Sequence, residues 1–85
     1  MYELLLTRNA HRSFDAADKK LAARLKRCFE QLRDHPLAGP NVRRLRGKLE
    51  GCYRYRVGDW RVVYQVNEET RTVTVLLIVH RSKAY

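Results

Sequence analysis

The stretch from Gly51 to Tyr85 constrains the fold more than any other part of this 85-residue chain. It contains three runs rich in Val, Tyr, Thr and Ile, namely Cys52–Val57, Trp60–Val66 and Thr72–His80. Gly58-Asp59 separates the first two runs, and Asn67–Arg71 separates the last two. Runs of this composition, interrupted by residues typical of turns, predict consecutive antiparallel strands. The stretch therefore predicts a three-stranded antiparallel meander.

The arginines of this stretch fall at positions that strand geometry brings together. Successive side chains of a strand point to opposite faces, so Arg54 and Arg56 share one face, away from the tyrosines between them. Arg61 alternates in the next run with Trp60. Arg81 follows the third run and is in phase with Val75, Leu77 and Val79. We expect the four arginines to lie together on one sheet face, as a polyanion site and a candidate active site.

The charge of the chain favours the same kind of partner. Lysine and arginine number 18 against 9 acidic residues, which gives a net charge of +9. Arginine, which binds phosphate through two parallel hydrogen bonds, accounts for 13 of the 18. Nucleic acid is the partner that such a balance favours. A membrane surface is less favoured, because no helical segment pairs a basic face with bulky aromatics. The plain alternative is a solvated basic surface.

The first 34 residues predict one strand and two helices. Tyr2–Leu6 is almost wholly apolar, so we expect a strand buried on both faces. Thr7 is placed to cap a short helix over Arg8–Phe14, and Asp18 begins a longer helix, Asp18–Arg33. The longer helix carries an apolar stripe at helical spacing, formed by Leu21, Leu25, Cys28, Phe29 and Leu32. We expect a single α+β domain over 1–85, with the helices packed against the meander sheet.

The connection from Pro36 to Glu50 is loop-rich and basic. It contains four cations in six positions, Arg43, Arg44, Arg46 and Lys48. Leu45 and Leu49 are placed to anchor the connection, which leaves the cations pointing outward. A connection of this length is commonly functional. We expect these four residues to bind RNA.

The remaining reactive side chains limit the chemistry. The three histidines and two cysteines lack the spacing of a metal site, and both cysteines are expected to be buried, so we expect no metal and no cofactor. His80 and Tyr85 lie near Arg81. Arginines with a proton-transfer group suit RNA cleavage by its own 2′-hydroxyl, which needs charge neutralisation, positioning and proton transfer. Histidine titrates near neutrality, which makes His80 a candidate, although a histidine at a strand end is commonly a surface residue.

These features together resemble the RelE family of toxin–antitoxin toxins. The shared order is a strand, two helices, a basic RLRG loop, the segment YRYRVGDWRVVYQV and a terminal HRxxxY pattern. The similarity extends over essentially the whole chain and is strongest over Leu45–Gly47 and Tyr53–Val66, and at Arg81 and Tyr85. The resemblance implies a metal-independent endoribonuclease that enters the ribosomal A site. It also implies cleavage of messenger RNA to a 2′,3′-cyclic phosphate and a 5′-hydroxyl.

The resemblance can be carried over position by position. Arg61, Arg81 and Tyr85 match family residues directly, whereas Arg54 and Arg56 fall where the founding members have two lysines. Arginine keeps its proton at any working pH and cannot act as a general base. Proton transfer is therefore left to His80 or Tyr85, and the sequence leaves this choice open.

Other functions and the partners follow from the same resemblance. ParE-type toxins share the fold and poison DNA gyrase without being nucleases, and a non-catalytic basic RNA-binding module is a third class. The expected partners are messenger RNA in the A site, ribosomal RNA and an antitoxin with an acidic segment. No apolar run reaches the roughly 18–20 residues that span a bilayer, so we expect no membrane partner and a cytoplasmic location.

Overall fold

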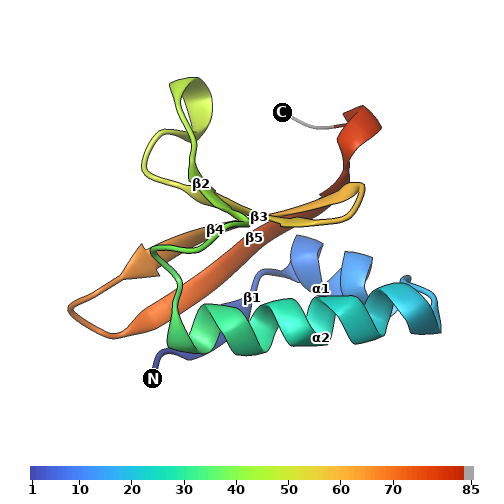
Figure 1. The fold of residues 1–85 in the computed structure, drawn as a ribbon, viewed down its shortest axis with the longest axis horizontal. Helices are drawn as coiled ribbons and strands as arrows, with labels where there is room; N and C mark the ends of the chain where they lie inside the picture. Colours follow the sequence, from blue (N-terminus) through green and yellow to red (C-terminus); the bar gives the residue numbers. More distant parts are fainter. Residues whose placement is uncertain (84–85) are drawn as a thin grey trace.

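The structure, a computed structural model, describes residues 1–83. Within these residues two helices, α1 (Arg8–Asp15) and α2 (Lys19–Asp34), cover one side of a five-stranded sheet (Figure 1). The strands are β1 (Glu3–Leu6), β2 (Val42–Arg44), β3 (Tyr53–Val57), β4 (Trp60–Asn67) and β5 (Thr72–His80). Short 3₁₀ turns occur at η1 (Gly47–Leu49) and η2 (Arg81–Lys83). The predicted α+β class is confirmed, and no helix of residues 1–83 is long and apolar enough to cross a membrane.

The predicted three-stranded meander is only the centre of a larger, mixed sheet. The strand order is β1-β5-β4-β3-β2, and the predicted runs correspond to β3, β4 and β5. β2 pairs antiparallel with β3, whereas β1 pairs in parallel with β5. β2 was expected to be part of a loop, because three residues between glycines and prolines give no periodic signal. The predicted antiparallel meander is therefore present as β3–β5, but the predicted three-stranded sheet lacked β1 and β2.

β1 is an edge strand, which corrects a second expectation. Its apolar composition predicted burial on both faces, yet it has a neighbour on one side only, β5, among the described strands. Its side chains alternate between exposed and half-buried, and Leu5 is 48% exposed. A short run of leucines therefore did not distinguish an edge strand from a central one.

The first helix begins at the capping residue that the sequence predicted, Thr7, whereas Asp18 caps the second helix and is not its first residue, as the sequence had suggested. The Thr7 hydroxyl accepts a hydrogen bond from the backbone N–H of Ala10 at 3.2 Å. The Asp18 carboxylate accepts one from the backbone N–H of Leu21 at 2.8 Å. These oxygens satisfy backbone N–H groups that the first turn of a helix leaves without partners.

The core lies between α2 and the sheet. Leu25, Cys28, Phe29 and Leu32 are the buried stripe of α2, as its spacing predicted. They face the side chains of the covered sheet face, among them Val57, Val62, Tyr64, Val73, Val75 and Ile78. Tyr64 is fully buried, and its hydroxyl donates a hydrogen bond to the backbone carbonyl of Pro36 at 2.6 Å. A buried hydroxyl with a partner avoids the cost of losing its contact with water.

A β-bulge at Leu76 changes which side chains of β5 share a face. Val63 pairs with Leu77 and Tyr64 pairs with Val75, so Leu76 has no partner in the register. The carbonyl of Leu76 instead accepts a hydrogen bond from the Thr7 hydroxyl at 2.8 Å. Side chains before and after a bulge change face relative to strict alternation. Val75 therefore faces the helices, whereas Leu77 faces the opposite side.

Candidate functional site

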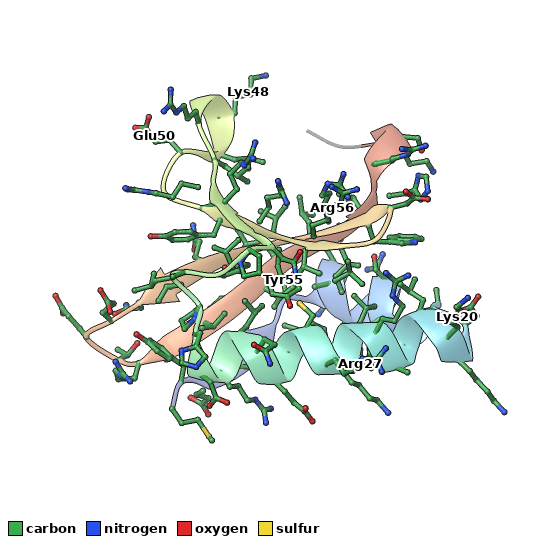
Figure 2. The ribbon with its side chains drawn as sticks, viewed as in Figure 1. Lys20, Arg27, Lys48, Glu50, Tyr55 and Arg56 are labelled. Carbon is green, nitrogen blue, oxygen red and sulfur yellow. The ribbon has the colours of Figure 1, made fainter. Side chains whose placement is uncertain are left out.

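The candidate site is the sheet face opposite the helices, which we call the arginine face. It carries Arg43, Arg54, Arg56 and Arg61 from three neighbouring strands. Figure 2 shows the division at β3, where Tyr55 lies between the sheet and α2 and Arg56 lies on the other side. The β2–β3 connection and the C-terminal turn η2 rise on this same side (Figure 1). Strand alternation thus brings Arg54, Arg56 and Arg61 together, as the sequence predicted.

The arginines of this face occur as pairs of like charge. Arg43 is directly opposite Arg54, and Arg56 is directly opposite Arg61. Like charges at opposite positions of neighbouring strands destabilise a sheet. Within residues 1–83, Arg43, Arg56 and Arg61 have no carboxylate within ion-pair distance. The face therefore has a local excess of positive charge that a bound polyanion would neutralise.

Apolar side chains form the floor between the arginines. Val63 lies next to Arg54 in the register and has no exposed area. Leu77 and Val79, the β5 partners of Val63 and Arg61, are half-buried on the same face. The hydrocarbon part of an arginine can cover such a floor while its guanidinium group stays in water. The face thus combines apolar contact with charge, which suits a nucleic-acid strand with bases and phosphates.

The β3–β4 turn holds three of the predicted arginines. The Gly58 carbonyl accepts hydrogen bonds from Arg56 Nε at 3.3 Å and from Arg61 Nη1 at 3.0 Å. The Asp59 carbonyl accepts one from the Arg81 backbone N–H at 2.7 Å, and the Asp59 carboxylate lies 3.7 Å from Arg81 Nε. This turn brings Arg81, which is distant in sequence, to the end of the arginine face. The sequence predicted only a turn at Gly58 and Asp59 and gave no sign of this role.

His80 is not placed with the arginines. It pairs with Trp60 across β4 and β5, and the two rings meet edge to face with centroids 5.3 Å apart. Trp60 packs against the core on the helix side, so His80 faces that side too. Its Nδ1 contacts the Ser82 hydroxyl at 2.9 Å. The expectation that His80 lies beside the arginines is corrected because β5 reaches His80 in the phase of Ile78, which faces the helices.

The other predicted residues lie at the margins of the face or beyond it. Arg44, Arg46 and Lys48 are exposed, as expected, and Figure 2 shows Lys48 at the raised β2–β3 connection. Arg44 and Arg46 line a hollow that also contains Glu50, so this connection is less purely basic than its arginines suggested. Tyr85 lies outside the described residues.

The titratable groups of the core offer no alternative site. Burial raises the pKa of the Cys28 thiol to about 12 and also raises the pKa of the Tyr64 hydroxyl. Both groups therefore stay protonated near neutral pH and are poor nucleophiles. Both cysteines are buried, as predicted. Within residues 1–83, no three histidine, cysteine or carboxylate side chains are grouped so that they could hold a metal ion.

Comparison with known proteins identifies relatives over nearly the whole chain. A sequence profile of the family described as "ParE toxin of type II toxin-antitoxin system, parDE" matches residues 4–85. The Toxin RelE of Mycobacterium tuberculosis is 33% identical over 86 residues, which cover 99% of this chain and 86% of that protein.

Two solved structures show the same fold. The toxin–antitoxin complex RelBE2 of Mycobacterium tuberculosis matches with a TM-score of 0.80 and 30% identity, over 94% of this chain and 98% of that chain. The archaeal RelE–RelB complex of Pyrococcus horikoshii matches with a TM-score of 0.82 and 25% identity, over 98% of each chain.

Proposed function

The chain belongs to the RelE/ParE superfamily of type II toxin–antitoxin toxins, and from this premise we propose that it is an endoribonuclease that cleaves messenger RNA in the ribosomal A site. The observation that carries the proposal is the succession of two cross-strand arginine pairs, Arg43–Arg54 and Arg56–Arg61, on the uncovered sheet face. Such pairs cost stability and are useful when a polyanion binds over them. The relatives named RelE support this choice.

The proposed reaction uses a nucleophile from the substrate. The 2′-oxygen of one nucleotide attacks the adjacent phosphorus, the bond from phosphorus to the 5′-oxygen breaks, and a 2′,3′-cyclic phosphate forms. The 2′-hydroxyl proton passes to a base, and the leaving 5′-oxygen receives a proton to become a 5′-hydroxyl. No metal, oxidant or further reactant is needed. The protein has to position the strand, neutralise charge and transfer protons.

The arginines divide the electrostatic part of this work. Arg61 and Arg81 hold and neutralise the scissile phosphate, because both are fixed to the β3–β4 turn through Gly58 and Asp59. Arg54 and Arg56 stabilise the charge that develops in the transition state. Guanidinium groups are suited to both tasks because they remain charged at any working pH and present several donors in a fixed plane.

Proton transfer is assigned to Tyr85 in preference to His80. The resemblance to RelE toxins carries Tyr85 directly, whereas His80 contacts the Trp60 ring edge to face on the helix side. Nearby guanidinium groups would lower the pKa of a tyrosine hydroxyl by stabilising its phenolate form. The test is the single-turnover cleavage rate against pH for Tyr85→Phe and His80→Gln. We expect the larger loss in Tyr85→Phe, and parental rates in both variants would move proton transfer to the ribosome or the substrate.

An antitoxin and the ribosome complete the proposed partners. Two of the matched structures are toxin–antitoxin complexes, and a net charge of +9 favours an antitoxin with an acidic segment. Arg43, Arg44, Arg46 and Lys48 are exposed and placed to contact RNA. Changing the three arginines together to alanine should weaken binding to ribosomes and its salt dependence without abolishing the chemical step.

The experiment that tests the function is induced expression without a partner, followed by mapping of messenger RNA 5′ ends. The proposal predicts new ends within translated codons, and these ends should disappear in Arg61→Ala. If RNA is bound but never cut, the protein is a basic RNA-binding module.

Poisoning of DNA gyrase is the second candidate, because the family profile carries the ParE description. A supercoiling assay with purified gyrase separates the two functions. If the protein is a gyrase poison, the parental protein should inhibit DNA supercoiling by gyrase and leave messenger RNA intact.

A further inference from the structure

A second cationic hollow lies between α2 and the outer end of β3. Its volume is about 420 Å³, and apart from Arg56 and Gly58 none of its lining residues has a role in the proposed reaction or in the basic β2–β3 connection. Its polar lining consists of Arg24, Arg27, Gln31, Asn41, Tyr55 and Arg56. Hollows with this composition bind anions through guanidinium groups and orient them through amides.

The charge of this hollow is not neutralised within the protein. Arg24, Arg27 and Gln31 follow one another at helical spacing, so they form one stripe of α2. The residue four positions after Arg27 is the neutral Gln31, and the lining contains no carboxylate. Over residues 1–83, neither Arg24 nor Arg27 has a carboxylate within ion-pair distance. An anion that neutralises this charge would therefore come from outside residues 1–83.

The hollow is continuous with the arginine face. An ideal Cβ placed on Gly58 would lie 2.6 Å from Arg24 Nη2, so the Arg24 guanidinium lies directly against this turn. The same Gly58 carbonyl holds Arg56 and Arg61. Arg56 lines the hollow and also belongs to the arginine face. A single flexible polyanion that passes over Arg56 can therefore contact both regions.

We infer that this hollow is a second phosphate-binding site, which holds the backbone of an RNA strand outside the nucleotide that is cut. The inference rests on the proposed function for the identity of its ligand. An RNA strand fits better than an acidic peptide for two reasons. The phosphates of RNA recur along one strand, so a single strand that passes over Arg56 can place phosphates both in the hollow and on the arginine face. The half-buried Tyr55 ring and the amides of Gln31 and Asn41 also suit a base and sugar.

Binding of a single-stranded 2′-O-methyl RNA, measured by fluorescence anisotropy against salt, tests the inference. This RNA lacks the free 2′-hydroxyl and cannot be cut, so binding is separated from cleavage. Each phosphate contact to a single strand contributes about 0.7 to the slope of log affinity against log salt. Arg24→Gln with Arg27→Gln should reduce that slope by about 1.4, which corresponds to two contacts. Arg24→Lys with Arg27→Lys keeps the charge and should retain most of the slope.

The matched control is Lys19→Gln with Lys20→Gln, which removes the same charge from the exposed N-terminal end of α2. Figure 2 shows Lys20 at that end, away from Tyr55. This control should leave the slope close to the parental value. Equal slopes for the two glutamine pairs would overturn the inference, because bulk charge would then explain the binding. The inference would also be overturned if the Arg24→Gln, Arg27→Gln variant lost affinity for a poly-glutamate peptide but not for RNA. That result would favour an acidic peptide as the ligand.

The same set of proteins separates this inference from the proposed function. If the hollow variants keep the parental slope while the parental protein cuts messenger RNA, only the second phosphate site is wrong. If the predicted difference in slope is found and no protein cuts messenger RNA, the proposed chemistry is wrong and the phosphate site is supported.

Discussion

Tyr64 and Arg61 lie three positions apart on β4, and they represent the two faces of one sheet. Tyr64 is fully buried against α2, and its hydroxyl has a backbone partner at 2.6 Å. Arg61 is half-buried on the opposite face, directly across from another arginine, and its guanidinium is held by carbonyl oxygens at 3.0 Å. The covered face thus concentrates the apolar contacts that stabilise the fold. The arginine face holds like charges at directly opposite positions of neighbouring strands. These charges do not stabilise the fold, and they suit the binding of an anionic ligand.

This difference predicts that substitutions on the two faces change different quantities. On the covered face they should change the free energy of unfolding and leave the activity of the folded fraction alone. On the arginine face they should change binding and rate with little change in stability.

Leu25→Ala should give the largest change, a loss of about 2–5 kcal/mol in the free energy of unfolding. Leu25 has no exposed area and packs in the core, so alanine leaves a cavity that the surroundings fill only in part. Urea denaturation followed by circular dichroism measures the loss. The cleavage rate per folded molecule should stay parental, and a specific loss of rate would show that the two faces are coupled.

Arg61→Ala should reduce the single-turnover cleavage rate by about 10²–10³, the usual cost of removing one donor to a developing anion. Its free energy of unfolding should stay the same or rise slightly, because the like-charge pair with Arg56 is removed. Rate and stability are measured on the same preparation. A large loss of stability would contradict the division, because the arginine would then support the fold.

Tyr64→Phe should cost about 1–3 kcal/mol, because it leaves the buried carbonyl of Pro36 without its hydrogen bond. The variant also tests the pH dependence of stability. Burial raises the pKa of the Tyr64 hydroxyl, so its contribution is complete below the ordinary tyrosine pKa of about 10 and is lost as pH rises above it. The free energy of unfolding should therefore fall less at alkaline pH in Tyr64→Phe than in the parental protein. Part of the fall that remains in this variant should come from Cys28, because burial raises the pKa of its thiol as well.

Asp59→Asn should have the smallest effect, a loss of up to about fivefold in cleavage rate. Its carboxylate lies 3.7 Å from Arg81 Nε, and both side chains are largely exposed, so the ion pair contributes about 1 kcal/mol or less. The backbone bond from Arg81 to the Asp59 carbonyl remains in the variant. Asp59→Glu should restore most of the rate, and a loss as large as that of Arg61→Ala would give Asp59 a direct role.

Local patterns predicted much of this architecture. Alternation placed Arg54, Arg56 and Arg61 on one face, and helical spacing gave the buried side of α2. The hydroxyl of Thr7 marked the start of the first helix, because capping depends only on neighbouring backbone groups. The acidic residues up to Asp18 located the start of the second helix to within one residue.

The features that were missed depend on contacts between distant segments. The bulge at Leu76 is stabilised by a hydrogen bond from Thr7, which is 69 positions away in the sequence. β2 exists because β3 offers it a partner, and β1 is an edge strand because of the strand order. His80 was expected near the arginines because it precedes Arg81 in the sequence, but neighbouring residues of a strand point to opposite faces, and His80 shares its face with Trp60. The role of Gly58 is carried by its carbonyl group, which every residue has, so residue type gave no signal for it.

The most direct test of the central claim is cleavage of messenger RNA on purified, programmed ribosomes, with one 2′-deoxynucleotide placed at the cut position. We expect the parental protein to convert the all-ribose message to a 2′,3′-cyclic phosphate and a 5′-hydroxyl. The deoxy message should remain intact, because it lacks the nucleophile, while binding with parental affinity. Cleavage of the deoxy message, or products with a 5′-phosphate, would contradict the account.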